Sequence, residues 1–407
     1  MAVDLPRTLG VLVVGGGPIG AIAARSSASS GADTWVIEKK DRVSNSSSCG
    51  GLLSVAAFEG LEVSRNSILN EISGVVVYPP HEDRFVVESS VTRAYVVDRS
   101  ALNQELMDAA MEEGAQLRTS VRAVQLESER IKLKHLADST SAWFEPNIVL
   151  GSDGPYSDIR RELGLPDPGK YLHGIQAVSR CELNDQSLVE VHFGSDIATG
   201  FFGWVIPLGR DGLARIGLAS VNRDGLLERL ERLLDRKSAG EPQSLSSGPI
   251  PIGVPNVSAS GNVGLVGDAA GQVKPTTGGG IYPGSKSARI AGEMAAAVCD
   301  NSSAFQNHDF AESYHNRWME EVGADLKREM FLHRILAEIS DPVLDTILRK
   351  LSNPRYIKIL RESGDIDHLY RTALEIFKKP ARWGNFIHLL PSKVRDSLTR
   401  AIFQKDK

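Results

Sequence analysis

Two glycine-rich segments of this chain have the residue types and the spacing that bind phosphate groups. In the first, an apolar run at 11–14 leads into Gly15, Gly17 and Gly20, and an Ala-rich stretch follows that we expect to be helical from 21 to 30. The first glycine permits a tight turn, the second lets a pyrophosphate approach the backbone, and the third lets helix and strand pack closely. Because a helix N-terminus also attracts anions, this segment predicts a dinucleotide site.

An acidic residue follows this segment at the distance that a dinucleotide site requires. The run 34–38 predicts the next strand, and Glu38 stands about 20 residues after the glycines, where an acid accepts hydrogen bonds from ribose hydroxyls. A free 2′-hydroxyl suits FAD or NAD better than NADP. A glycine turn beside a surface glutamate is the alternative, but it does not explain why strand, loop, helix, strand and acid follow in this order.

The second glycine-rich segment lies far downstream and favours FAD over NAD alone. Asp268 follows a predicted strand at 262–266, where an acid can bind the ribityl chain of a flavin. Consecutive glycines at 278–280 precede a helix that we expect from about 285 to 298. Their backbone N–H groups can lie against the pyrimidine edge of the flavin. A third signal, a predicted strand leading into Asp153-Gly154, stands between the two segments.

At these residues the chain resembles the FAD-dependent family built like para-hydroxybenzoate hydroxylase, whose GxGxxG, DG and GD fingerprints occur here in order. The resemblance covers roughly the first 300 residues. It implies that Asp153 and its neighbours help to hold the FAD pyrophosphate and any nicotinamide donor, and that Asp268 binds the ribityl chain. The segment 95–102 is similar to the family segment that leads into a helix and places an arginine, here Arg99, near the cofactor. A surface salt bridge or a helix N-terminal residue is the alternative role for Arg99.

Local features resemble the geranylgeranyl reductases within this family. Gly271 stands where hydroxylases usually carry histidine, and 275–281 is similar to the reductase pattern. Phe202-Gly-Trp204-Val-Ile-Pro207 is similar to their PxxYxWxFP substrate motif but departs from it, since it has Thr199, Phe202 and Ile206 in place of proline, tyrosine and phenylalanine. The same stretch also resembles the WxWxIP of flavin halogenases. We predict Phe202, Trp204 and Pro207 as substrate-binding residues, with packing inside a sheet as the alternative.

A cysteine followed by two glycines comes shortly after Glu38, in a segment that passes the flavin in this fold. Cys49 is therefore the candidate catalytic residue, either as proton donor to the substrate or as a positioner of flavin and substrate, while an inert buried cysteine is the alternative. The cofactor-binding residues that the motifs and the resemblance predict are Gly15, Gly17, Pro18, Gly20, Glu38, Lys39, Cys49, Gly50, Gly51, Arg99, Asp153, Gly154, Gly267, Asp268, Gly278, Gly279, Gly280 and Ile281.

The resemblance implies an FAD-dependent reductase that saturates C=C bonds of geranylgeranyl chains in isoprenoid lipids or prenyl diphosphates. Hydride would pass from reduced FAD to one alkene carbon and a proton would reach the other. A ferredoxin, a deazaflavin or NAD(P)H could supply the electrons. A flavin-dependent monooxygenase or halogenase remains an alternative, as does an electron-transfer protein without lipid chemistry, because the fold alone does not decide the reaction.

Composition narrows the classes of partner. The 407 residues carry a formal charge of −5, which does not support a nucleic-acid partner. Three widely spaced cysteines suggest neither a disulfide framework nor a metal site, and we expect a reducing, cytoplasmic setting with no bound metal. No apolar run approaches the roughly 20 residues that span a bilayer.

We expect an α/β protein in which a Rossmann-like FAD-binding domain, 1–165 and 255–300, is interleaved with an antiparallel-sheet substrate domain, 166–254, and followed by a helical region, 301–407. The stretch 72–91 should add strands at the edge of the FAD domain. The helical region ends in a basic segment, 378–395, that mixes cations with Trp383, Phe386 and Leu389. This composition suits either a peripheral anchor on anionic lipid at the inner face of the cell membrane or a cap over the substrate.

Overall fold

The computed structural model describes residues 5–43, 49–127, 129–183, 185–210, 212–300 and 310–377. The chain divides into two compact units, and each of them is assembled from three separate segments. The first unit comprises Met1–Ile68, Val97–Tyr171 and Pro249–Lys327, and the second comprises Leu69–Val96, Leu172–Gly248 and Arg328–Lys407.

The sheet of the first unit is built around β1 (Thr8–Val14), which pairs in parallel with β2 (Thr34–Ile37) and β11 (Ser141–Gly151). Its strand order is β17-β18-β11-β1-β2-β8, with β17 at Ala259–Ser260, β18 at Val263–Leu265 and β8 at Gln116–Arg118. The side chains of β1 from Val11 to Val13 have no exposed surface, as expected of a parallel strand that is covered on both faces.

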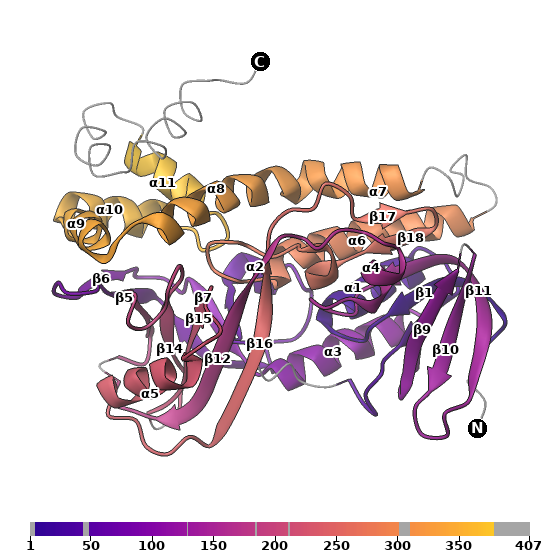
Figure 1. Ribbon diagram of the computed structural model, residues 1–407, viewed down its shortest axis with the longest axis horizontal. Coiled ribbons are helices and arrows are strands. Elements are labelled where there is room, and N and C mark those ends of the chain that lie inside the picture. The colour runs from indigo at the N-terminus through magenta and orange to yellow at the C-terminus, as the bar shows by residue number, and fades with distance from the viewer. Residues whose placement is uncertain are drawn as a thin grey trace. The chain divides into compact units, whose positions relative to one another are not determined.

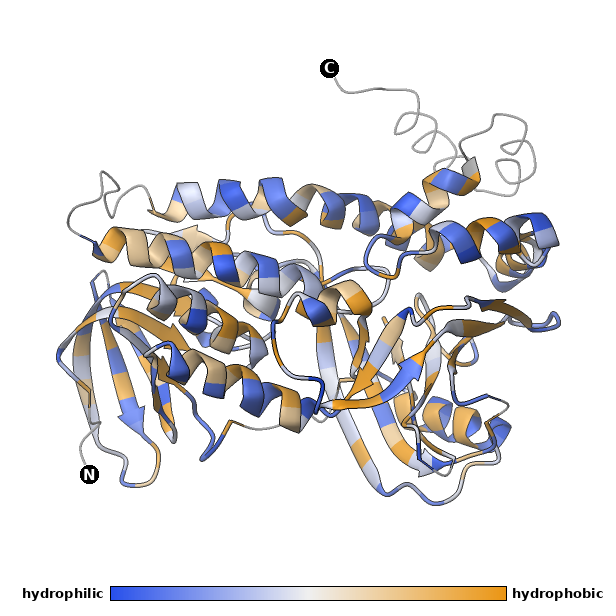
Figure 2. Cartoon of the chain, turned by 180° about the vertical axis from the view of Figure 1, so that it is seen from behind, coloured by the Kyte–Doolittle hydropathy of each residue, from blue (hydrophilic) through white to orange (hydrophobic). Residues whose placement is uncertain are grey.

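Two further strands extend this sheet with antiparallel pairing. β9 (Val121–Glu127) pairs with β10 (Arg130–His135), which pairs with the first part of β11. Figure 2 shows alternating hydrophobic and hydrophilic bands along these strands, the pattern of a sheet with one face on the core and one in solvent. Ile131 and Leu133 provide the buried side of β10.

Helix α1 (Pro18–Ser29) packs against α3 (Arg99–Glu112) and α6 (Ile281–Cys299) (Figure 1). Small residues make the α1–α6 contact close. A side chain on Gly292 would collide with the backbone of Ala23, and Ser26 Oγ donates to the carbonyl of Arg289 at 3.0 Å. The contact joins an element near the N-terminus to one that follows more than 250 residues later in the chain.

The second unit contains a seven-stranded sheet in the order β16-β12-β15-β14-β13-β5-β6. The strands are β5 (Gly74–Tyr78), β6 (Phe85–Glu88), β12 (Lys170–Arg180), β13 (Leu188–His192), β14 (Gly203–Pro207), β15 (Leu213–Ser220) and β16 (Ser244–Ile252). We expected the 72–91 stretch at the edge of the FAD domain, and this was wrong, because β5 pairs with β13. That pairing is parallel, so the sheet is mixed and not wholly antiparallel as expected.

Helix α5 (Leu226–Arg236) covers one face of this sheet with Leu230 and Leu233, which pack on Val205 and Ile216. An ionic group lies in the interior beneath it. Glu190 accepts a hydrogen bond from Lys237 Nζ at 2.7 Å, and its other oxygen lies 2.9 Å from His192 Nε2. These three residues are 3 to 8% exposed. Although burial opposes ionisation, the two partners hold the pKa of Glu190 below its usual range.

The described part of the C-terminal region is helical, as expected. It contains α7 (Phe310–Trp318), a π-helical turn (Met319–Gly323), α8 (Ala324–Glu338), α9 (Asp341–Leu351), α10 (Pro354–Ser363) and α11 (Leu369–Phe377). The basic segment 378–395 lies outside the described residues. In the part of the chain that the structure describes, no helix combines the length and the apolar character needed to cross a membrane.

The remaining elements are short. They are β3 (Leu52–Ser54), β4 (Ile68–Ile72) and β7 (Ala94–Val97), which form a three-stranded sheet in the order β3-β7-β4, with α2 (Val55–Glu59), α4 (Asp158–Glu162) and a 3-10 turn (Gly267–Ala270).

Candidate functional site

The first glycine loop connects β1 to α1 and has one open side. A Cβ on Gly15, whose φ is +108°, would lie 2.5 Å from the carbonyl oxygen of Ser152, and one on Gly20 would overlap the carbonyl oxygen of Gly15. A Cβ on Gly17 would meet nothing within 4 Å. Gly17 caps α1 and Pro18 begins it, so the open side coincides with the positive end of the helix.

Glu38 is oriented by this loop and by the residues that follow it. Its Oε2 accepts from the backbone N–H of Gly16 at 2.9 Å, and its Oε1 accepts from that of Lys40 at 3.0 Å. Each carboxylate oxygen has more than one acceptor site, so hydroxyl groups can still donate to it. Lys39 is exposed. The geometry is compatible with the predicted ribose contact of Glu38.

The Asp153-Gly154 loop lies beside the first loop. Ser152 Oγ donates to the carbonyl oxygens of Val14 and Gly15 at 3.0 and 2.8 Å. Asp153 Oδ2 accepts from the backbone N–H groups of Asp158 and Ile159, at the start of α4. Its Oδ1 is buried and finds no hydrogen-bond partner within the described ranges. One oxygen of Asp153 therefore accepts hydrogen bonds from the backbone, and the other is available to a bound group.

Arg160 joins this loop to the second glycine-rich segment. It is only 3% exposed, and its guanidinium donates to the carbonyl oxygens of Ala269 and Pro155, both at 3.0 Å. Its Nη2 also donates to Asp167 and to the Tyr171 hydroxyl. Because Ala269 follows Asp268 directly, Arg160 fixes two of the predicted cofactor-binding loops relative to each other.

Asp268 lies in the 3-10 turn, close to the triple glycine. A Cβ on Gly280 would lie 3.0 Å from Asp268 Oδ1, so glycine at 280 leaves the carboxylate room. A Cβ on Gly267 would lie 3.0 Å from Ile19 Cγ2 on α1, which shows how closely the two glycine segments approach. Burial raises the pKa of Asp268 to about 6, and the positive charge of Arg99 opposes that rise.

Arg99 is the first residue of α3, where the side chain of Asp98 caps the helix. It is 6% exposed, and its Nη2 donates to Asn103 Oδ1 at 3.1 Å while its Nη1 lies 3.6 Å from Cys49 Sγ. A surface salt bridge is therefore excluded for Arg99, whereas its position at the N-terminus of α3 agrees with the other alternative. The backbone N–H of Gly51 also donates to Cys49 Sγ, at 3.4 Å. Arg99 thus brings the thiol and Asp268 into one electrostatic environment, which the spacing along the chain did not reveal.

The first unit fits FAD. The fit rests on the open face of Gly17 and on three buried polar atoms that lack a partner among the residues described, namely Asp153 Oδ1, Arg99 Nε and Thr277 Oγ1. Gly280 is the N-cap of α6 and Ile281 its first residue, and the first backbone N–H groups of a helix have no partner within it. Gly278 and Gly279 precede the helix, and the N–H of Gly278 donates to the carbonyl oxygen of Lys274 at 2.8 Å. All of the predicted cofactor-binding residues belong to this unit.

The predicted substrate residues lie in the second unit, within an aromatic cluster. Phe202 stacks on Phe201 with ring centroids 4.2 Å apart, and it meets the edge of Trp204 at 6.4 Å. Phe193 and His333 extend the cluster at 6.0 Å from Phe202 and 6.2 Å from Phe201. The four rings other than His333 are partly exposed. The sequence motif did not identify Phe193, Phe201 or His333.

Pro207 does not share the face of Trp204. Successive side chains of a strand point to opposite faces, so in β14 Trp204 and Pro207 lie on opposite sides. Pro207 is buried, and its carbonyl oxygen accepts from Asn70 Nδ2 at 3.1 Å. This geometry favours a structural role for Pro207.

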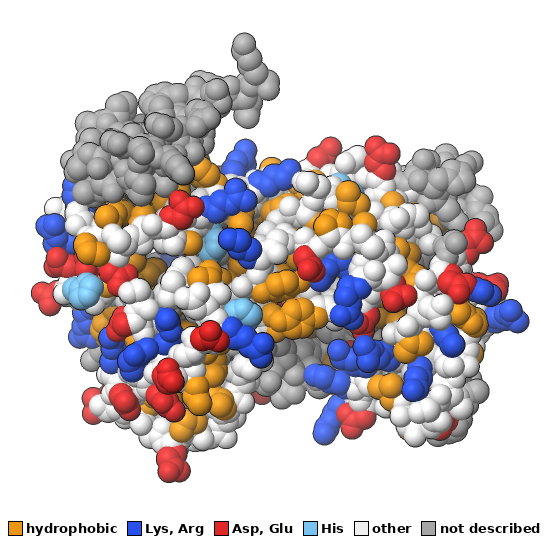
Figure 3. Space-filling view, in the orientation of Figure 1, with side chains coloured by type: hydrophobic (Ala, Val, Ile, Leu, Met, Phe, Trp, Pro, Cys, Tyr) orange, Lys and Arg blue, Asp and Glu red, His pale blue; other side chains and the backbone are white. Residues whose placement is uncertain are grey.

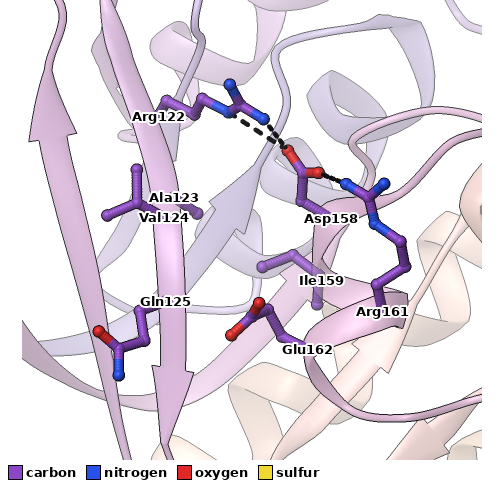
Figure 4. Close-up of a pocket in the computed structure, with 8 residues that line it drawn as sticks. All are labelled: Arg122, Ala123, Val124, Gln125, Asp158, Ile159, Arg161 and Glu162. Atoms are coloured by element: carbon purple, nitrogen blue, oxygen red, sulfur yellow. Dashed lines mark hydrogen bonds and ion pairs between the residues drawn. The ribbon is translucent and has the colours of Figure 1, made fainter.

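A surface pocket of the first unit lies between β9 and α4 (Figure 4). Asp158 accepts hydrogen bonds there from both Arg122 and Arg161, so the two cations are paired. In Figure 3, Lys and Arg side chains gather over this part of the surface, with Lys132 and Lys134 of β10 close by in the sheet. None of the residues that line this pocket is a predicted cofactor or substrate residue.

Comparisons with known proteins agree with an FAD-binding chain. A model of the FAD-binding domain family matches residues 8–181. The chain is 30% identical over 385 residues to digeranylgeranylglycerophospholipid reductase 2 of Methanothermobacter thermautotrophicus, over 90% of this chain and 99% of that relative. It is 28% identical over 365 residues to the digeranylgeranylglycerophospholipid reductase of Methanocaldococcus jannaschii, over 86% of this chain and 92% of that relative.

Among solved structures, the chain is similar to a geranylgeranyl bacteriochlorophyll reductase-like protein from Thermoplasma acidophilum, with a TM-score of 0.81 and 24% identity. The similarity covers 94% of this chain and 100% of that one. At this identity the likeness shows a shared fold, in agreement with the expected α/β class.

Proposed function

The chain belongs to the digeranylgeranylglycerophospholipid reductase family of FAD-dependent oxidoreductases, and from this premise we propose that it saturates C=C bonds in the geranylgeranyl chains of isoprenoid ether lipids or their precursors. The observation that carries the proposal is the Arg99–Cys49 contact beside Asp268, because it puts an oriented thiol next to the predicted flavin site. A ferredoxin, a deazaflavin or NAD(P)H would supply the electrons.

Bound FAD in its reduced form supplies a hydride. An isolated alkene has no carbonyl to accept the negative charge, so one carbon must receive a proton while positive charge develops on the more substituted carbon. We assign the proton transfer to Cys49 or to a water that it orders. In the contacts with Arg99 and Gly51 the sulfur of Cys49 is the acceptor, and both contacts orient the thiol.

The aromatic cluster of the second unit suits a prenyl chain. The aromatic faces of Phe202 and Trp204 provide surface on which an apolar chain can pack. Phe202 has no hydroxyl, so it offers apolar surface without a polar group that would need a partner. We therefore assign Phe201, Phe202 and Trp204 to prenyl binding.

The test is mass spectrometry of a geranylgeranyl ether lipid after anaerobic incubation with the purified protein and chemically reduced flavin. The external reductant makes the result independent of the natural electron donor. We expect mass gains in steps of two hydrogens, and none with protein from which the flavin has been removed. If the lipid mass stays constant although FAD is bound and reducible, the proposed substrate class is wrong.

A further inference from the structure

Gly217 of β15 occupies a narrow space between two neighbouring strands. It is directly opposite Trp204 of β14 on one side and Gln176 of β12 on the other. A Cβ on Gly217 would lie 2.5 Å from Gln176 Cβ, 2.7 Å from the carbonyl oxygen of Ile175 and 2.7 Å from Cε2 of the Trp204 indole. The indole thus lies across Gly217, in the place where any other side chain would begin.

Space alone explains the glycine. Gly217 does not have a positive φ, so its backbone conformation is open to other residues. Gly15 and Gly267, by contrast, have φ values of +108° and +65°, which favour glycine. Two of the surrounding contacts are with the Cβ of Gln176 and the backbone oxygen of Ile175, which cannot move away by a simple side-chain rotation, and the third is with the Trp204 ring.

The position of the Trp204 ring depends on this space and not on a polar anchor. Its Nε1 is enclosed and makes no hydrogen bond to any residue that the structure describes. Its ring contact is the edge-on one with Phe202, at 6.4 Å. A ring held by shape moves when the shape beneath it changes, since no hydrogen bond has to break.

We propose that Gly217 is a specificity-determining residue, which keeps the Trp204 indole close to the sheet and so leaves room beside Phe202 for a long prenyl chain. The inference rests on the proposed function, because it takes Trp204 as a contact of the chain. A methyl group at 217 lifts the indole toward Phe202. A long chain, which must cover more of the aromatic cluster, then loses more binding than a short one.

The experiment compares Gly217→Ala with the wild-type protein on geranylgeranyl and geranyl ethers of glycerol, using chemically reduced flavin. We expect kcat/KM for the geranylgeranyl ether to fall at least about tenfold more than for the geranyl ether, the range that a methylene-sized change in an apolar site produces. FAD affinity should not change, because the cofactor-binding residues belong to the other unit.

Gly203→Ala is the matched control. Gly203 precedes Trp204 in β14, but a Cβ there would meet Ile197 Cγ2 at 2.9 Å and Leu233 Cδ2 at 3.1 Å, on the α5 side of the sheet. This variant also crowds the sheet, so it should lower stability without changing the preference between the two ethers. An equal loss of preference in both variants would overturn the inference and indicate general damage to the sheet.

A compensating change keeps the inference falsifiable if Gly217→Ala is unstable. In the double variant Gly217→Ala with Trp204→Phe, the smaller ring removes the contact with the indole and leaves those with Gln176 Cβ and the Ile175 carbonyl oxygen. Stability should therefore stay reduced, but the preference between the two ethers should return to that of Trp204→Phe alone. Absence of this rescue contradicts the inference. If wild type reduces neither ether, the proposed function fails; if it reduces both and Gly217→Ala keeps the wild-type preference, only the inference about Gly217 fails.

Discussion

The guanidinium Nη1 of Arg99 lies 3.6 Å from the sulfur of Cys49, although 50 residues separate the two in the chain. Arg99 also acts electrostatically on Asp268, and Asn103 holds its other amino group. A single buried cation therefore links the candidate catalytic thiol to the acid that we predict to bind the ribityl chain.

Replacing Cys49 by alanine should separate catalysis from cofactor binding. If the thiol donates the proton or orders the donor, Cys49→Ala lowers the single-turnover rate of reduced-flavin oxidation by the prenyl lipid by a hundredfold or more, roughly the contribution of a general acid. FAD affinity should change little. Anaerobic stopped-flow absorbance of the flavin measures the rate, and Cys299→Ala, which alters a half-buried thiol of α6, is the control. An unchanged rate in Cys49→Ala removes Cys49 from the chemistry.

Alanine at two glycines of the first loop should affect different properties, FAD binding in one variant and stability in the other. Gly17→Ala meets open space in the protein, so we expect the apoprotein to keep its free energy of unfolding to within about 0.5 kcal/mol. The pyrophosphate of FAD should approach the backbone at residue 17, where the new methyl group would stand. FAD should therefore bind Gly17→Ala at least about tenfold more weakly than the wild-type protein, a loss of ~1.4 kcal/mol. Gly20→Ala collides with the Gly15 carbonyl and should lower stability by about 1 to 3 kcal/mol.

Calorimetric titration with FAD and denaturant unfolding of the apoprotein measure these two quantities. Unaltered FAD affinity in Gly17→Ala would mean that the cofactor does not lie against the open face of the loop.

The affinity for FAD should depend on pH through Asp268. Its pKa in the protein is about 6, and hydroxyl donors of the cofactor favour the ionised form, so binding lowers that pKa and releases a proton. Affinity should therefore fall by up to about tenfold for each pH unit below 6 and level off above it. Flavin fluorescence titrations at pH 5 and 7.5 measure the change, and Asp268→Asn should abolish it. The same slope in Asp268→Asn would assign the proton to another group.

The same pKa has a consequence for the apoprotein. Because it is raised above the usual value of an aspartate, the contribution of Asp268 to stability is fully present at low pH and is lost as pH rises through about 6. Asp268→Asn should remove this decline.

The pKa of Glu190, in the interior ionic group of the second unit, is shifted in the opposite direction, so its contribution to stability is present at high pH and is lost as pH falls. Lys237→Met leaves the Glu190 carboxylate buried without its cation, which should cost about 3 to 5 kcal/mol at pH 8. Burial then dominates and raises the pKa of Glu190, so the deficit should shrink as pH falls to 5 and the carboxyl group takes up a proton. Urea unfolding of the variant and the wild-type protein at pH 5 and pH 8 measures this deficit in the free energy of unfolding. Arg232→Met, an exposed change on α5, is the control, and an equal deficit at both pH values contradicts the assignment.

The first glycine loop could be predicted from sequence because its parts are local. Gly15, Gly17 and Gly20 stand close together in the sequence, and Glu38 follows the next strand directly. The expected starts of α1 and α6 were nevertheless three or four residues late. Their first turns contain Gly20 and Gly284, which have low helix propensity, although the first turn tolerates them when packing demands a close approach.

The rest of the site depends on contacts between residues distant in sequence. Nothing in the segment around Arg99 indicates that its side chain meets Cys49, and Phe193 and His333 join the aromatic cluster from elements outside the motif. The alternation of apolar and polar residues identified the strands in 72–91. It does not specify which strand β5 pairs with, so the pairing with β13 was missed.

Because α1 packs against α6, the order in which the ribosome synthesises these two helices determines when the protein can bind its cofactor. The loop before α1 leaves the ribosome early, but the triple glycine and α6 are not complete until residue 299 has been synthesised. A nascent chain that ends before the second glycine-rich segment lacks Asp268 and the triple glycine, so we expect capture of FAD late in translation or after it. Limited supply of flavin in the cell would then leave behind full-length, folded apoprotein and not arrested fragments.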